Sequence, residues 1–125
     1  MATEARKPTL LCVDDNEMAL EVRQLVLESA GYSVLTANNF VTAMELFSSS
    51  VVDLVISDHV LEEGTGTELA VMMKKLKPDV PIAILSGLVD APEGIEHADL
   101  FICKTDPLPE VLRKISDLLN GRSLH

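Results

Sequence analysis

Hydrophobic and polar positions follow two alternating patterns along this chain. Five short, mostly apolar runs have the length of β-strands and are bounded by polar or turn-forming residues: Thr9–Val13, Ser33–Thr36, Leu54–Ser57, Ile82–Leu85 and Leu100–Cys103. Several of these runs are apolar throughout, which is typical of strands that are covered on both faces.

Between the strand-like runs, apolar residues recur at helical spacing. The first predicted helix carries Met18, Val22, Leu25 and Val26 on one face and closes at Ala30-Gly31; the second is capped by Asn39 and ends in Ser48–Ser50. The third runs from about Thr67 to Leu76, and the last opens at Pro107–Pro109 and ends at Asn120-Gly121. The fourth segment, Gly87 to Asp99, contains Pro92 and Gly94, so it predicts at most two helical turns.

The alternation of strands and helices predicts an α/β fold. Connections long enough for a helix favour parallel strands, which places the sheet between helices. No repeat or interdomain linker interrupts the pattern, so we expect one domain over residues 1–125 with a core from about 8 to 120.

Composition narrows the range of partners. Ten Lys and Arg against twenty Asp and Glu give a net charge of −10, which disfavours direct binding to nucleic acid. No apolar run approaches the ~20 residues of a membrane span, and the N-terminus lacks the apolar stretch of a signal peptide, so we expect a cytoplasmic protein without membrane insertion. Cys12 and Cys103 each lie in an apolar run and are expected to be buried free thiols.

Polar side chains concentrate where the predicted strands end. The first strand ends in Asp14-Asp15, the third in Asp58, the fourth in Ser86-Gly87 and the fifth in Lys104. Ligands of such sheets bind outside the carboxyl ends of the strands, so these side chains are expected to converge on one edge. Taken singly, each has a simpler explanation; Asp15 or Asn16, for example, could cap the first helix.

Carboxylates that lie this close repel one another, and a hard divalent cation such as Mg²⁺ removes that cost. A lysine ammonium and a serine hydroxyl nearby would complete the surroundings of a phosphoryl group. An Asp of the cluster can itself accept that group as a nucleophile.

Four motifs in this order, "LLCVDDNE", "DLVISDHVLEEGTG", "IAILSG" and "ADLFICKTDP", resemble those of receiver domains of two-component response regulators, the family of the single-domain chemotaxis regulator. The resemblance extends from Pro8 to about Leu119. It implies a three-layer flavodoxin-like fold, in which a five-stranded parallel sheet of order 2-1-3-4-5 has helices on both faces.

The resemblance also implies roles for individual residues. Asp58 matches the phosphoacceptor, and Asp14, Asp15 and Asp58 match the acids that hold Mg²⁺ (or Mn²⁺) together with the backbone carbonyl of Val60. Ser86 and Lys104 match residues that contact the phosphoryl group, Gly87 matches the small residue beside its path, and Phe101 matches the aromatic residue whose rotamer follows the serine.

The function implied is a signalling switch that catalyses its own phosphorylation and slow dephosphorylation. A sensor histidine kinase or a histidine phosphotransfer protein would supply the phosphoryl group, and the surface of the fourth helix, fifth strand and fifth helix would signal to an unidentified downstream effector. Three alternatives stay open: a degenerate receiver that binds partners without phosphorylation, a phosphatase with an Asp nucleophile, and a flavin- or nucleotide-binding module.

Several positions depart from the family pattern. Thr105 follows Lys104 where Pro is usual, and Glu62 and Thr65 are expected to loosen the loop after Asp58. Apolar Val60 and Leu88, two residues beyond Asp58 and Ser86, are expected to shield the acyl phosphate and slow its hydrolysis. His59 is expected to face solvent and to point away from Asp58.

Overall fold

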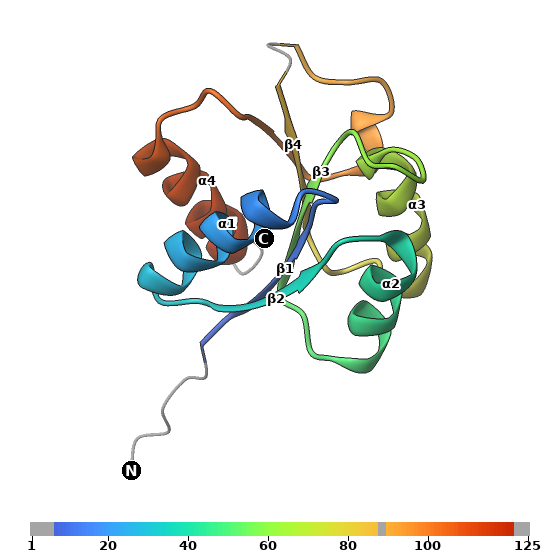
Figure 1. The fold of residues 1–125 in the computed structure, drawn as a ribbon, viewed down its shortest axis with the longest axis horizontal. Helices are drawn as coiled ribbons and strands as arrows, with labels where there is room; N and C mark the ends of the chain where they lie inside the picture. The colour runs from blue at the N-terminus through green and yellow to red at the C-terminus, as the bar shows by residue number, and fades with distance from the viewer. Residues whose placement is uncertain (1–6, 88–89, 122–125) are drawn as a thin grey trace.

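The computed structural model describes residues 7–87 and 90–121 and contains a parallel sheet of five strands in the order β2-β1-β3-β4-β5 (Figure 1). The strands are β1 (Thr9–Val13), β2 (Ser33–Ala37), β3 (Leu54–Asp58), β4 (Ile82–Ser86) and β5 (Leu100–Cys103). The predicted fold and strand order are therefore confirmed, and each predicted strand is found with its end shifted by at most one residue.

Helices cover both faces of the sheet. They are α1 (Glu17–Ser29), α2 (Phe40–Ser49), α3 (Gly66–Leu76) and α4 (Leu108–Gly121), with one 3₁₀ turn, η1 (Ile95–His97). Helices α1 and α4 lie on one face, and α2 and α3 lie on the other (Figure 1).

Two apolar clusters fill the spaces between the sheet and its helices. In β1, Leu10 and Cys12 face α1 and α4, whereas Leu11 and Val13 face α2 and α3. All four side chains are fully buried, because a central parallel strand is covered on both faces. With few aromatic residues in the chain, aliphatic side chains supply most of this core, as its composition predicts.

Polar side chains at the helix starts position the loops beside the sheet edge. The Asn16 side chain accepts a hydrogen bond from the Ala19 N–H at 3.1 Å, and the Asn39 side chain accepts one from Thr42 at 2.8 Å. Thr65 and Glu68 form a reciprocal capping box at the start of α3. Each such cap is worth about 1 kcal/mol, so the loops that precede α1 and α3 are held at their helix ends.

In the described part of the segment between β4 and β5, residues 87 and 90–99, the single turn η1 is the one helical element, in agreement with the prediction of at most two helical turns. Gly94, with φ +87°, precedes this turn, and a Cβ at that position would lie 3.0 Å from the Thr67 hydroxyl oxygen. Phe101, on β5, is half-exposed and belongs to neither apolar cluster.

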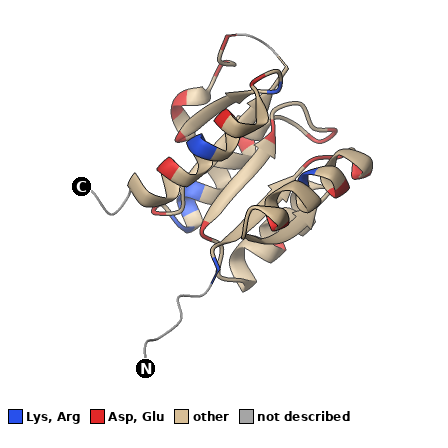
Figure 2. Ribbon diagram, turned by 90° about the vertical axis from the view of Figure 1, so that its left-hand side faces the viewer, with Lys and Arg blue, Asp and Glu red and all other residues tan. Residues whose placement is uncertain are grey.

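Acidic residues are spread over the helices and loops, and basic residues are fewer (Figure 2). Within the described residues, no helix has the length and apolar character needed to cross a membrane. Cys12 and Cys103 are free thiols, as predicted, but only Cys12 is fully buried. Burial raises the pKa of the Cys12 thiol to about 12, an effect that the positive charge of Arg23 partly opposes.

Candidate functional site

The predicted convergence of polar side chains at one edge of the sheet is present. Asp14 directly follows β1, Asp58 ends β3 and Ser86 ends β4, and all three side chains are buried. Strand β3 lies between β1 and β4, with Val13 opposite Ser57 and Asp58 opposite Leu85. This register places the ends of the three strands side by side, next to the point where the strand order reverses.

Three carboxylates form a cluster at this edge. One oxygen each from Asp14, Asp15 and Asp58 lies within 4.8 Å of the other two. Asp14 and Asp58 are almost inaccessible, whereas Asp15 is half-buried. Hard carboxylate oxygens at this spacing suit Mg²⁺, which takes oxygen ligands and keeps part of its water shell. The donor set therefore fits the predicted cation.

Lys104 supplies the positively charged partner of Asp58, the candidate phosphoacceptor. Its Nζ atom lies 2.6 Å from Asp58 Oδ1. The Lys104 backbone N–H donates to the Ser86 carbonyl oxygen at 2.8 Å, which fixes the start of the β5–α4 loop against the end of β4. The lysine side chain is 42% exposed, so its ammonium keeps access to water while it neutralises the buried carboxylate.

Asp14 has partners of its own. Its Oδ1 atom accepts the Asn16 backbone N–H at 2.9 Å, and its Oδ2 atom lies 3.3 Å from Nη1 of Arg23. Asn16, rather than Asp15, caps α1, so the two acids are not used as helix caps. The sequence pattern did not single out Arg23. The available signal was its position within an apolar helix face, four residues after Ala19 and four before Leu27, where a charged side chain needs a partner.

Ser86 and Phe101 project from the same face of neighbouring strands. Ile84 pairs with Phe101 across β4 and β5, and Ser86 lies two residues beyond Ile84. Ser86 is 4% exposed, whereas Gly87 is open to solvent and a Cβ there would meet nothing within 4 Å. The structure thus places the predicted serine and glycine at the end of β4, and the predicted aromatic residue on the neighbouring strand β5, opposite Ile84.

The loop after Asp58 is closed by hydrogen bonds. An isolated bridge joins Val60 to Thr65, and the Gly66 N–H donates to the His59 carbonyl at 2.7 Å. The Val60 side chain is 72% exposed, and Leu88, its predicted companion, lies outside the described residues. His59 is half-buried, and its Nδ1 atom is shielded from solvent with no hydrogen-bond partner in the described part of the chain, so the expectation that it faces solvent is wrong for this atom.

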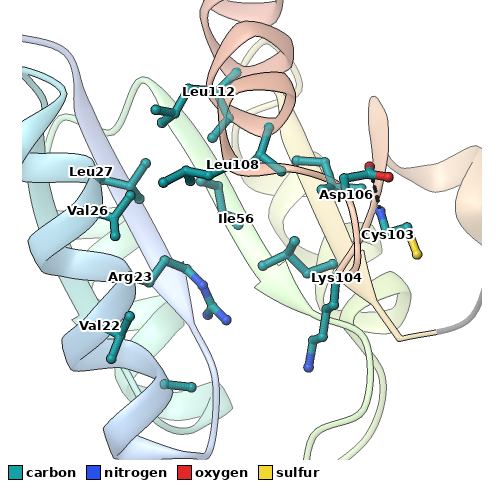
Figure 3. Close-up of a pocket in the computed structure, with 15 residues that line it drawn as sticks. Val22, Arg23, Val26, Leu27, Ile56, Cys103, Lys104, Asp106, Leu108 and Leu112 are labelled. Carbon is teal, nitrogen blue, oxygen red and sulfur yellow. Dashed lines mark hydrogen bonds between the residues drawn. The ribbon is translucent and has the colours of Figure 1, made fainter.

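An apolar groove of about 550 Å³ lies beside the cluster, between α1 and α4. Figure 3 shows side chains of Val26, Leu27 and Leu112 along its walls, with the tips of Arg23 and Lys104 toward one end. The groove therefore ends beside the cations that pair with the two buried acids.

Fold and site together define a receiver domain. The chain matches the profile of the "Response regulator receiver domain" family over residues 10–115 and belongs to that family. A curated relative, the autoinducer 1 sensor kinase/phosphatase LuxN of Vibrio campbellii, is 37% identical over 82 residues, which are 66% of this chain and 10% of LuxN. The chain spans only about a tenth to a fifth of the length of the first curated relatives that it matches.

Solved structures agree with this assignment. The response regulator protein TrrA from Thermotoga maritima, in complex with Mg(2+)-BeF, superimposes with a TM-score of 0.83 at 29% identity, covering 89% of this chain and 98% of TrrA. A structure of the histidine kinase ThkA in complex with TrrA matches with a TM-score of 0.82 at 30% identity, covering 90% of this chain and 98% of the matched chain.

Proposed function

We propose that this chain accepts a phosphoryl group on Asp58 from a phosphohistidine of a sensor histidine kinase or a histidine phosphotransfer protein. The observation that carries the proposal is the pairing of buried Asp58 with Lys104 at 2.6 Å inside a cluster of three carboxylates. Like charges gathered at a buried site reduce stability, and such a cost is typical of functional sites. The ThkA–TrrA complex supports a histidine kinase as the class of partner.

In the transfer, an Asp58 carboxylate oxygen attacks phosphorus in line with the bond to the donor imidazole. A bond forms between this oxygen and phosphorus, the P–N bond breaks, and its electron pair stays on the imidazole nitrogen. Lys104, whose Nζ atom lies 2.6 Å from Asp58 Oδ1, would hold a phosphoryl oxygen once the group is on Asp58, and the hydroxyl of Ser86, at the end of the neighbouring strand β4, would donate a hydrogen bond to another. Positioning and charge neutralisation are the main demands of phosphoryl transfer.

The carboxylate oxygens of Asp14, Asp15 and Asp58 would hold Mg²⁺, with the Val60 carbonyl as the further predicted ligand. When bound, Mg²⁺ supplies the positive charge that lets an anionic phosphoryl group approach an anionic acceptor. The TrrA structure with Mg(2+)-BeF supports this choice of metal.

The output surface of the proposal consists of η1, β5 and α4. Ser86 and Phe101 lie on the same face of adjacent strands, and in this proposal the serine moves toward the phosphoryl group while the aromatic ring turns inward behind it. Phe101 is half-exposed, and among the described residues of the β4–β5 connection the turn η1 is the one helical element. We therefore propose that the signal leaves through β5 and α4 more than through the short segment that replaces a full helix.

The proposal is tested by incubating purified protein with Mg²⁺ and a small acyl-phosphate donor and measuring the intact mass. We expect a gain of one phosphoryl group that requires Mg²⁺ and disappears when EDTA is present. A wild-type protein that gains no mass would leave the phosphorylation-independent interaction module as the better description. Steady release of phosphate from an unrelated phosphate ester would instead favour the phosphatase.

Helix α1 carries an exposed apolar stripe that suits a docking partner. Met18, Val22 and Leu25 are 77%, 60% and 67% exposed, and their spacing places them on one side of the helix that begins two residues after Asp15. Leu25→Glu is therefore expected to slow transfer from an autophosphorylated histidine kinase by about tenfold or more, since it places a charge in an apolar contact. Labelled phosphoryl transfer measures this rate, using whichever kinase of a purified panel phosphorylates the wild type fastest.

Phosphorylation of Leu25→Glu by the small donor should stay unchanged, because Leu25 is not part of the acidic cluster. The matched control is Val51→Glu, since Val51 is also 67% exposed but precedes β3, at the opposite end of the strands. Equal losses in both variants would show that added charge, and not the stripe, governs the transfer.

Val60 provides a prediction about the lifetime of the phosphorylated state. The side chain is apolar at a position where a polar group would orient the hydrolytic water, so Val60→Asn is expected to accelerate loss of the phosphoryl group several-fold. Because Val60 is 72% exposed, the substitution should leave the free energy of unfolding within about 0.5 kcal/mol of the wild type. The decay is followed by intact mass after the donor is removed, and an unchanged rate would contradict the shielding hypothesis.

A further inference from the structure

Arg23 is the one described residue of α1 that contacts the acidic cluster through a charged side chain. Its Nη1 atom lies 3.3 Å from Asp14 Oδ2, and its side chain is only 18% exposed. It lines the apolar groove between α1 and α4, and its tip points toward the same end as that of Lys104 (Figure 3). The aliphatic stem thus crosses an apolar wall in order to bring a guanidinium to the site.

The guanidinium of Arg23 changes the net charge of the metal-free site. Asp14, Asp15 and Asp58 carry three negative charges, and Arg23 and Lys104 return two, which leaves a net charge of −1. Without Arg23 the net charge would be −2. A divalent cation is attracted more strongly to a site with a net charge of −2 than to one with a net charge of −1.

Both buried acids of the cluster are paired before any metal arrives. Asp58 Oδ1 faces Lys104, and Asp14 offers one oxygen to the Asn16 N–H and the other to Arg23. Asp15 has no ion pair with any residue in the described ranges 7–87 and 90–121. A cation that binds at the cluster therefore meets one unpaired carboxylate and two that already have a positive partner.

We infer that Arg23 competes with Mg²⁺ for Asp14 and sets the concentration of Mg²⁺ at which the site fills. This inference rests on the proposed Mg²⁺ site. Arg23 stabilises the metal-free protein by neutralising a carboxylate that is 3% exposed, and it opposes the metal because its charge stays close to the cluster. The guanidinium lies toward one end of the groove (Figure 3), and we expect it to turn toward water when it releases Asp14.

If Arg23 has this role, loss of its charge lowers the stability of the metal-free protein and raises its affinity for Mg²⁺. Arg23→Met keeps an apolar stem in the groove and removes the charge. The metal-free variant is expected to melt at a lower temperature, because Asp14 loses its counter-ion. Its dissociation constant for Mg²⁺ is expected to fall by roughly tenfold. This is the size of effect expected when one unit positive charge, partly screened by water, is removed from the neighbourhood of a divalent cation. A residue that only packed or only oriented Asp14 would not give this combination.

Isothermal titration with MgCl₂ at constant ionic strength measures the dissociation constant, and thermal melts in EDTA measure the stability of the metal-free state. Arg23→Lys keeps the charge and should retain most of the wild-type behaviour. Arg113→Met is the matched control, because it changes the net charge equally at a side chain of α4 that is 63% exposed and pairs with Asp117. It should leave the Mg²⁺ affinity unchanged.

Tighter Mg²⁺ binding by Arg23→Met but not by Arg113→Met would support the inference. Unchanged or weaker binding, in a wild-type protein that binds Mg²⁺ and gains the phosphoryl group, would overturn the role of Arg23 and leave the proposed function intact. A wild-type protein that shows neither property would overturn both.

Discussion

Asp58→Asn is expected to abolish phosphoryl incorporation and to leave the metal-free protein at least as stable as the wild type. The amide has no carboxylate oxygen for in-line attack, so no acyl phosphate can form. The same change removes one of three carboxylates that lie within 4.8 Å of one another, which relieves their mutual repulsion. Lys104 loses its partner at little cost, because its side chain is 42% exposed and its ammonium can be rehydrated.

We expect the free energy of unfolding in EDTA to rise by about 0.5–1.5 kcal/mol in this variant. Denaturant unfolding measures this change, and intact mass after treatment with Mg²⁺ and the acyl-phosphate donor measures incorporation. Asp79→Asn is a matched control at an exposed acid in the turn before β4, on the opposite edge of the sheet. A persistent adduct on Asp58→Asn would show that another residue accepts the phosphoryl group.

Gly66→Ala is expected to cost about 2–4 kcal/mol of stability and to impair the site at the same time. An added Cβ would lie 2.5 Å from the backbone carbonyl oxygen of Asp58 and 3.1 Å from Cδ1 of Ile84. The Asp58 carbonyl also accepts a hydrogen bond from the Ser57 hydroxyl at 2.9 Å, so it cannot retreat without breaking a buried contact. Relief of the clash must move either α3 or the end of β3, which carries the phosphoacceptor.

Denaturant unfolding and the rate of phosphorylation by the small donor measure the two effects of Gly66→Ala. Gly87→Ala is the control for stability, because a Cβ there meets nothing within 4 Å and its φ is not positive. Its unfolding free energy should stay within about 0.5 kcal/mol of the wild type. A Gly66→Ala protein with wild-type stability would mean that α3 approaches β3 less closely than the structure shows.

The fold and the main acidic residues of the site were predictable for the same physical reason. Apolar strand runs ended in Asp14, Asp58 and Lys104, and parallel strands bring such ends to one edge. Lys104 follows β5 and Asp58 ends β3, with β4 between them, so the strand order brings the two residues near enough for the long lysine side chain to reach the carboxylate at 2.6 Å. The strand order itself came from the family resemblance, since the hydrophobic pattern does not determine which strands are neighbours.

Three features of the structure were missed in the sequence analysis, each for a different reason. Arg23 lies nine residues after Asp14, and nothing in the helical pattern states whether its guanidinium reaches the sheet edge or solvent. Thr65 and Glu68 match the sequence signature of a capping box, so their role was open to prediction. The burial of His59 Nδ1 depends on how the loop after β3 closes, which is a property of the packed structure.

The strand order has a consequence for how the site forms while the chain is being synthesised. Asp14, Asp15 and Asp58 leave the ribosome well before Lys104, which reaches Asp58 only when β5 has joined β4 at the margin of the sheet. An unfinished chain therefore has the acids without the lysine that the proposed transfer requires. Assembly of this sheet and assembly of the proposed phosphoacceptor site therefore coincide, because β5, the strand of the sheet that is synthesised after the other four, leads directly into Lys104.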